Sequence, residues 1–289
     1  MVRTSPGALS LPSSELNRTV HTSVSQSVAK RVRALARSKS FRDQERCFIV
    51  DTTKQILELL ARKADQIEAL LLTPDFLTRH QEILFTSRAA PHFRLYQCSR
   101  ETLDRLSDTQ TAQEALAIVR QPIWNATNFS GRSSLLAIYL DSVQDPTNVG
   151  SLVRTAAGFG LSGIWLSPGC ADIFSPKVVR ASAGTILTIP TCRDVEISSL
   201  PSSDLSWFAA DSNPQGAIPL SSITRRPTRT VLVFGNESRG LSEQVQQTCH
   251  VRFYIPLNAA VESLNVASAA AISIHHFSTL SMARTPPGE

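Results

Sequence analysis

The sequence predicts an α/β protein in which a small N-terminal unit precedes a larger, mostly parallel β-sheet with helices on both faces. From Leu135 onwards, short apolar runs alternate with helix-length segments, as they do in βαβ units. Several of these runs end in polar loops, which is typical of the ligand-binding edge of an open sheet. Residues 41–120 show a separate α/β pattern. We therefore expect two units.

Composition and charge set limits on function. Hydrophobic residues make up 42% of the 289 residues and charged residues 18%, which is ordinary for a globular protein. No apolar run approaches the roughly 18–20 residues that cross a bilayer, and the N-terminus lacks the apolar core of a secretory signal. We expect a cytoplasmic protein without a membrane partner. A Ser-rich, Arg-bearing and acid-poor N-terminus also resembles an organelle transit peptide, which is the alternative location.

Cysteine and histidine spacing gives no sign of a metal site. The five cysteines are scattered and none forms a C-x-x-C pair, and the six histidines lack ligand spacing. We expect reduced thiols, no disulfide framework and no metal.

The net positive charge of the chain lies at its N-terminus. Residues 1–42 contain eight Lys or Arg and a single acidic residue, whereas the whole chain has a net charge of +5. Such a cluster indicates a polyanionic partner such as RNA, and a solvated surface is the alternative. We expect residues 1–24 to be a flexible tail, and residues 284–289 a second one. The candidate RNA-binding residues are Arg31, Arg33, Arg37 and Lys39.

Residues 25–120 predict a compact unit with no catalytic set of side chains. Its expected helices are Val28–Leu35 and Thr53–Ala64, with helical pieces at Glu101–Leu106 and Thr111–Leu116. Its expected strands are Cys47–Val50, Ile67–Leu72 and Phe93–Cys98. Residues 121–134 are polar and irregular, so we expect them to be the inter-domain linker.

Residues 135–283 predict the larger unit. The expected strands are Leu135–Leu140, Gly163–Leu166, Thr185–Ile189, Trp207–Ala210, Thr230–Phe234 and Val251–Ile255. Function should lie in the loops after Leu140, Phe234 and Ile255.

The first of these loops, Asp141–Gly160, leads into a predicted helix over Asn148–Phe159 that Gly160 ends. Asn148 at its N-terminal end and a partly sheltered Arg154 suit an anion or a polar substrate. The alternative is that Asn148 caps the helix and Arg154 forms a surface ion pair. A G-x-G-x-x-G match at Gly158–Gly163 closes a helix instead of opening one, so we exclude a dinucleotide site.

The second loop lies in Val231–Gln244, where Glu237 sits between two glycines. We expect Gly235 to let the backbone approach a ligand and Gly240 to supply a turn. Ser242 is expected to cap the following helix. The alternative for Glu237 is a salt bridge to Arg239 or another neighbour.

The third loop lies in Tyr254–Phe277, where Ile255-Pro256-Leu257 ends a strand. Ser263 and Asn265 stand at the start of a helix with alanines on every side. Such a helix can be approached closely by other segments.

Together the three loops resemble the motifs of the SpoU (TrmH-like) family of S-adenosylmethionine-dependent RNA 2′-O-ribose methyltransferases, in the SPOUT superfamily. D-x-x-x-D-P-x-N-x-G-x-x-x-R-T-A lies at Asp141–Ala156, G-N-E-x-x-G-L at Gly235–Leu241 and I-P-L…E-S-L-N-V-A at Ile255–Ala267. Ser175–Gly184 resembles the family's substrate-side segment. Residues 25–120 resemble, more weakly, the L30e-like RNA-binding domain of many members, but Asp51-Thr52 replace the usual Glu-Gly.

The resemblance implies a trefoil-knotted fold for residues 135–283, a homodimer and S-adenosylmethionine as cofactor. The implied catalytic residues are Asn148, Arg154, Glu237, Ser263 and Asn265. The implied cofactor-binding residues are Phe234, Gly235, Asn236, Ile255, Leu257, Leu264 and Asn265. Arg154, Lys177 and Arg180 are implied to contact RNA.

The expected activity is methylation of a ribose 2′-hydroxyl in structured RNA, with rRNA the first candidate and tRNA the second. The alternatives are a catalytically idle RNA-binding or ribosome-assembly protein on the same fold, and an enzyme that methylates a base nitrogen. We expect Arg154 to orient phosphate and ribose, because a guanidinium stays protonated and is a poor base.

Overall fold

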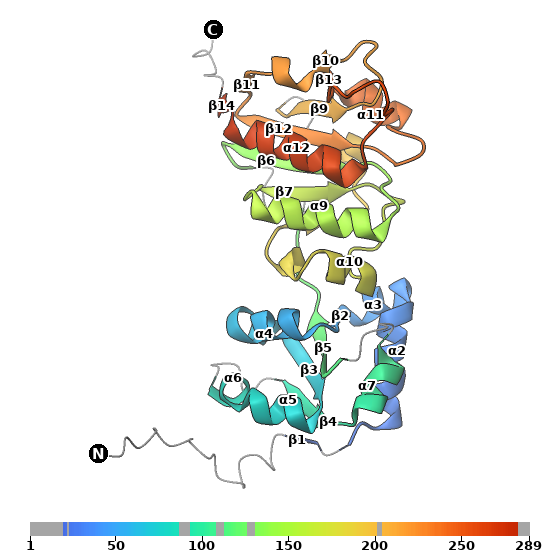
Figure 1. Ribbon diagram of the computed structural model, residues 1–289, viewed down its shortest axis with the longest axis vertical. Helices are drawn as coiled ribbons and strands as arrows, with labels where there is room; N and C mark the ends of the chain where they lie inside the picture. The colour runs from blue at the N-terminus through green and yellow to red at the C-terminus, as the bar shows by residue number, and fades with distance from the viewer. Residues whose placement is uncertain are drawn as a thin grey trace, which may run out of the picture. The chain divides into compact units, whose positions relative to one another are not determined.

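The computed structural model describes residues 20–21, 23–86, 93–107, 113–125, 131–200 and 204–282. The chain divides into two compact units, Met1–Arg120 and Gln121–Glu289 (Figure 1). Most of the tail expected at residues 1–24, and all of the one expected at 284–289, lie outside the described residues. Within the expected linker, Trp124 packs against the core of the second unit.

The first unit is a five-stranded sheet with helices around it. Strand order is β1-β4-β3-β5-β2, with β4 parallel to β1 and β3, and β5 antiparallel to β3 and β2. Its elements are β1 (Val20–His21), α2 (Gln26–Arg37), α3 (Lys39–Glu45), β2 (Cys47–Val50), α4 (Thr53–Arg62), η1 (Ala64–Gln66), β3 (Ile67–Leu72), α5 (Pro74–Arg79), α6 (Gln81–Thr86), β4 (Arg94–Gln97), α7 (Arg100–Leu106) and β5 (Ala115–Arg120).

The predicted first helix is confirmed and extends further at both ends. In α2, Ser25 Oγ accepts a hydrogen bond from the backbone N of Val28, and Val32 and Leu35 are buried. The apolar side of α2 therefore packs against the sheet, as its 3.6-residue period requires.

One helical prediction in this unit is wrong. Of the segment Thr111–Leu116, residues 111–112 lie outside the described part, and Ala115 and Leu116 begin β5. Ala and Leu at the start of this run favour a helix. Pairing with β2 on one side and β3 on the other buries five of its six residues, and this tertiary pairing overrides the local preference.

The second unit is a seven-stranded sheet in the order β10-β13-β9-β12-β6-β7-β8, in which every pair of neighbours is parallel. The predicted mostly parallel α/β sheet is confirmed. Its helices are α9 (Pro146–Gly158), α10 (Pro176–Ala181), η2 (Thr185–Leu187), η3 (Ile197–Ser199), η4 (Leu220–Ser222), α11 (Glu243–Thr248) and α12 (Val266–Thr279). Its strands are β6 (Leu135–Leu140), β7 (Gly163–Leu166), β8 (Thr191–Cys192), β9 (Ser206–Ala210), β10 (Ile218–Pro219), β11 (Arg225–Arg226), β12 (Arg229–Phe234), β13 (Val251–Tyr254) and β14 (Ser281–Met282), with β11 and β14 forming a separate parallel pair.

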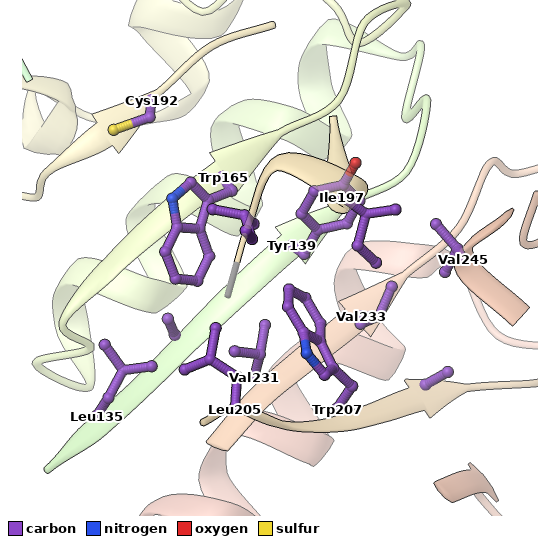
Figure 2. Packing of buried hydrophobic residues seen from close by; sticks show 13 residues of the cluster. Leu135, Tyr139, Trp165, Cys192, Ile197, Leu205, Trp207, Val231, Val233 and Val245 are labelled. Carbon is purple, nitrogen blue, oxygen red and sulfur yellow. The ribbon is translucent and has the colours of Figure 1, made fainter. Parts of the chain in front are cut away.

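Alternate residues of the strands face two different cores. Tyr139, Trp165 and Trp207 point to one side, where Ile197 of η3 and Val245 of α11 cover them (Figure 2). On the other side, Phe208 packs edge-to-face against Phe277 of α12. Helices α9 and α12 lie side by side along the sheet (Figure 1). The sheet therefore has helices on both faces, as the sequence predicts.

Helix α9 also packs closely against α10, and Gly150 permits this contact. A Cβ atom on Gly150 would lie 2.4 Å from Ala181 Cβ and 2.7 Å from the carbonyl oxygen of Val178. No other residue type fits at this position without a shift of α10.

The strand predicted at Thr185–Ile189 is wrong. These residues begin with the 3-10 turn η2, and the strand β8 starts later, at Thr191. Ala183 and Gly184, with φ of +50° and +83°, reverse the chain after α10. Side-chain hydrogen bonds from Thr185 to the Ser182 carbonyl and from Thr188 to the Thr185 carbonyl, at 2.7 and 2.8 Å, then hold the turn.

Candidate functional site

A cavity of about 920 Å³ lies at the carboxyl ends of β9, β12 and β13, which is the edge where parallel sheets bind ligands. This volume is in the range of cofactor-binding pockets. The residues that the sequence predicts as cofactor-binding all line it: Phe234, Gly235, Asn236, Ile255, Leu257, Leu264 and Asn265.

The loop after β6 orients the first predicted catalytic residue. Asp145 is the N-cap of α9, and its Oδ1 accepts hydrogen bonds from the backbone N of Thr147 and of Asn148, at 2.7 and 2.9 Å. Pro146 occupies the first turn, where its missing N–H has no cost. The interpretation of Asn148 as the cap is therefore wrong. Its side chain is only 9% exposed and is free to bond elsewhere.

Three predicted catalytic residues, far apart in sequence, form one hydrogen-bonded chain at the cavity. Asn148 Nδ2 donates to Glu237 Oε1 at 2.9 Å, and Asn265 Nδ2 donates to Asn148 Oδ1 at 2.9 Å. Asn265 Oδ1 accepts from the backbone N of Ala267 and of Ser268, which caps α12. Glu237 and Asn265 line the cavity itself. We call these three residues the Glu237–Asn148–Asn265 chain.

Glu237 is held as a carboxylate by amide donors. Besides Asn148, the backbone N of Gln144 and that of Asp145 each donate to it at 3.3 Å. Burial raises the pKa of Glu237, but the hydrogen bonds from Asn148 and the backbone amides outweigh it, so the pKa lies below its ordinary value. These amides are the partners of Glu237, and the alternative of a salt bridge to Arg239 is wrong.

Two further contacts fasten the loop after β12 to the loop after β6. Asp141, a buried residue, accepts from the backbone N of Ser242 at 2.7 Å, and Asn236 Nδ2 donates to the Ser142 carbonyl at 2.8 Å. Sequence reasoning gave Asp141 no role, although it is the first aspartate of the D-x-x-x-D-P pattern. Ser242 does occupy the N-cap position of α11, but its side chain makes no capping bond.

Gly235 lines the cavity, and its lack of a side chain is also needed within the loop itself. A Cβ atom on Gly235 would lie 2.6 Å from the carbonyl carbon and oxygen of Gly240. The residue therefore allows the loop to fold back on itself, where Asn236 and Gly240 form a backbone bridge. Gly240 has φ of +70° and makes the predicted turn.

Two predicted catalytic residues do not join the chain. Ser263 lines the cavity and is exposed. Arg154 is exposed on α9, so the expectation of a partly sheltered side chain is wrong. Within the described ranges, no side chain bonds to Arg154, and it does not line the cavity.

The predicted RNA-binding residues differ in their ion pairing and in their exposure. Arg31 donates to Glu45 at 2.8 Å and to Glu68 at 2.5 Å, so its charge is neutralised inside the first unit. These ion pairs leave Arg31 with less charge to offer a polyanion than an exposed, unpaired arginine has. Arg33, Arg37 and Lys39 are exposed on and after α2; on α10, Lys177 is exposed and Arg180 is half-buried.

The walls of the cavity combine acidic and apolar groups. Asp211, Glu237 and Glu262 line it along with a single basic residue, Arg239. Leu257 and Val261 are 39% and 48% exposed. Across the part of the chain that the structure describes, no cluster of His, Cys, Asp or Glu suits a metal ion, and no helix is long and apolar enough to span a membrane.

Comparisons with known proteins give a consistent result. Residues 135–275 match the SpoU rRNA Methylase family, and residues 27–117 match the MRM3-like substrate binding domain. An uncharacterized tRNA/rRNA methyltransferase of Synechocystis is 28% identical over 274 residues, which cover 92% of this chain and 96% of the relative. The 23S rRNA (guanosine(2553)-2′-O)-methyltransferase RlmP of Bacillus subtilis is 30% identical over 184 residues, or 63% of this chain and 71% of that protein.

Solved structures share the fold. A putative RNA methyltransferase of the TrmH family from Porphyromonas gingivalis superposes with a TM-score of 0.73 at 28% identity, over 88% of this chain and 98% of that one. The SpoU methyltransferase AviRb from Streptomyces viridochromogenes, solved in complex with AdoMet, superposes with a TM-score of 0.76 at 23% identity, over 87% and 97% of the two chains.

Proposed function

Because the chain belongs to the SpoU rRNA Methylase family, we propose that it transfers a methyl group from S-adenosylmethionine to a ribose 2′-hydroxyl of ribosomal RNA. The observation that carries this proposal is the Glu237–Asn148–Asn265 chain at the wall of the 920 Å³ cavity. An RNA-binding protein without activity would need neither the cavity nor this chain.

The cavity suits S-adenosylmethionine in size and in charge. Its three carboxylates and one guanidinium favour a cationic ligand, and Leu257 and Leu264 offer apolar surface to an aromatic base. The residues that would hold the cofactor are the seven predicted ones that line the cavity. The cofactor supplies an activated methyl group bonded to a sulfonium.

The protein supplies alignment, which by itself lowers a barrier by about 7–11 kcal/mol. Asn265 holds the reacting ribose, Asn148 orients Asn265, Glu237 holds Asn148, and Ser263 supports the loop beside them. Arg154 binds the phosphate next to the target, because an exposed guanidinium forms bidentate contacts with phosphate. The proton of the 2′-hydroxyl leaves to water or to a phosphate oxygen.

Residues 25–120 bind the RNA, through Arg33, Arg37 and Lys39 on and after α2, with Lys177 and Arg180 on α10 of the second unit. This role is supported by the match of residues 27–117 to a substrate binding domain. The second unit is knotted, with α12 as its threaded helix. The five free cysteines favour a reducing compartment, and we place the protein in the cytoplasm.

We also propose a homodimer. Phe159, directly after α9, and Ile272, on α12, are 43% and 44% exposed, and Phe159 packs against His275 of α12 at 5.8 Å between ring centroids. Two neighbouring helices that expose apolar side chains favour a partner at this face.

The decisive experiment maps 2′-O-methyl sites in total RNA from cells with and without the gene, with complementation by the wild type and by Asn148→Ala. We expect one rRNA site to lose its methyl group and only the wild type to restore it. A lost site in tRNA would change the substrate. No lost site, together with no binding of S-adenosylmethionine at millimolar concentration, would favour the idle RNA-binding alternative.

A further inference from the structure

The Glu237–Asn148–Asn265 chain has ends that fix its direction. At one end stands a carboxylate, which accepts hydrogen bonds and donates none. At the other end stand the backbone N–H groups of Ala267 and Ser268, which only donate. Between them lie two primary amides, and each can point its oxygen in one of two directions.

The two ends leave a single arrangement. Asn148 must turn its NH₂ group to Glu237, so its oxygen faces Asn265. Asn265 must turn its oxygen to the first turn of α12, so its NH₂ group faces Asn148. This assignment follows from donor and acceptor matching, and either amide in the reverse orientation would leave like groups facing each other.

We propose that the Glu237–Asn148–Asn265 chain makes Asn265 a hydrogen-bond donor towards the cavity. Asn265 presents an N–H group there and no acceptor atom. Its oxygen is used by α12 and one amide hydrogen by Asn148, which leaves the second hydrogen for a ligand. Asn265 and Glu237 both line the cavity, and Glu237 acts on Asn265 through Asn148, so Glu237 and Asn148 are positioning residues for it. The group that it receives is an oxygen acceptor. Resting on the proposed function, we assign this acceptor as the 2′-oxygen of the target ribose.

This assignment also excludes Asn265 and Asn148 as acceptors of the 2′-hydroxyl proton. Neither Asn265 nor Asn148 has a free acceptor atom towards the cavity, so neither takes the 2′-hydroxyl proton. Instead the N–H of Asn265 holds the oxygen, and its hydrogen bond strengthens if negative charge develops there. The proton passes to water or to a phosphate oxygen of the RNA.

One pair of variants separates helix capping from donation to the cavity. Ser and Asn are about equally good N-caps, so Asn265→Ser keeps the acceptor for α12 but loses both amide N–H donors without placing a carboxylate against Asn148 Oδ1, whereas Asn265→Ala loses all three contacts. We expect Asn265→Ser to melt above Asn265→Ala and yet to methylate RNA about 10²–10³-fold more slowly than the wild type at saturating substrate. Wild-type turnover in Asn265→Ser would show that Asn265 is only a cap, and would overturn the proposal.

A second experiment tests the direction of the chain without any ligand. In Asn148→Asp two carboxylates face each other, and in Glu237→Gln an amide stands where a carboxylate accepts three donors. The double variant Asn148→Asp/Glu237→Gln exchanges the two groups, so that the new amide donates to the new carboxylate and Asn265 keeps its orientation, while the Asp145 N–H loses the acceptor that it shares in the wild type. We expect the double variant to melt above Asn148→Asp, and the effects of the two changes to be strongly non-additive.

A double variant that melts no higher than Asn148→Asp would refute the proposed direction. Failure of the proposed function can be told apart from failure of this inference. If the proposed function is wrong, calorimetry would detect no cofactor binding by the wild type. The melting temperatures of the variants would still test the direction of the hydrogen bonds. Cofactor binding by the wild type with no rescue in the double variant would refute the inference alone.

Discussion

Replacing Gly150 tests how closely α9 and α10 pack. In Gly150→Ala the new methyl group would lie 2.4 Å from Ala181 Cβ and 2.7 Å from the Val178 carbonyl oxygen. Carbon atoms in contact normally lie about 3.5–4.0 Å apart, so α10 must move by roughly 1 Å. Two of the three nearest atoms, including the Ser182 backbone N at 3.0 Å, belong to backbone and cannot rotate away.

The magnitude follows from two opposing effects. Overpacking of a closed contact costs about 1–3 kcal/mol, and the better helix propensity of alanine offsets about 0.5–1 kcal/mol of it. We expect a net loss of roughly 0.5–2 kcal/mol, which for a domain of this size lowers the melting temperature by about 1–8 °C.

The same helix provides the matched control. A Cβ atom on Gly158, the last residue of α9, would have no atom within 4 Å. Gly158→Ala should therefore stabilise the protein by about 0.5 kcal/mol through helix propensity alone. The two variants change the same chemical group in the same helix and differ only in what surrounds it.

Tryptophan fluorescence during heating is a selective assay. All three tryptophans, Trp124, Trp165 and Trp207, belong to the second unit, so their signal follows that unit alone. If Gly150→Ala melts at or above Gly158→Ala, the close contact of α9 with α10 is refuted.

Four other predictions address RNA binding, pH dependence, assembly and catalysis. Arg33→Ala/Arg37→Ala should weaken RNA binding and flatten its salt dependence, whereas Arg31→Ala, already paired with Glu45 and Glu68, should leave the slope unchanged; equal slopes in all three proteins would contradict this. Hydrogen bonding to Arg31 lowers the pKa of Glu68, so the stability lost in Arg31→Leu should be full at neutral pH and shrink as the pH falls far enough for Glu68 to take up a proton in the folded wild type; pH-dependent melting checks this. If the proposed dimer forms, Ile272→Glu should convert it to a monomer in analytical ultracentrifugation, and Ile218→Glu, equally exposed at a sheet edge, should not. Arg154→Lys should slow single-turnover methylation by losing the bidentate fork, and a wild-type rate would count against phosphate positioning.

Much of the fold could be predicted because its signals are local. Apolar runs bounded by turn residues identified β2, β3, β6, β7, β9, β12 and β13, and the three motif loops led to the family that the comparisons confirm. The two errors arose where distant contacts or side-chain bonds to backbone override local preference. Pairing on both sides makes β5 a strand. The turn at Ala183 and Gly184 leads into η2, so that β8 begins only at Thr191.

The residues of the candidate site could be predicted, but not the full set of hydrogen bonds that join them. The sequence placed Asn148, Glu237 and Asn265 at one sheet edge, since parallel strands end together. It could not show that Asp145 takes over the capping, which frees Asn148 to join Glu237 to Asn265. Nor could it show that Arg154 is exposed, because its environment depends on how α9 packs.

The hydrogen bonds of the Glu237–Asn148–Asn265 chain have a consequence for the order in which the protein folds. The two side-chain bonds join residues 89 and 117 positions apart, and the second must wait for α12, the last helix of the described chain. The first bond can close when β6 pairs with β12, which lie about equally far apart in the sequence, whereas the second also needs α12 in place and closes a longer loop. A partly folded or prematurely ended chain would keep most of its sheet and still lack a wall of the cavity. Ligand binding should therefore be the last property that the chain acquires on folding and the first that it loses on unfolding.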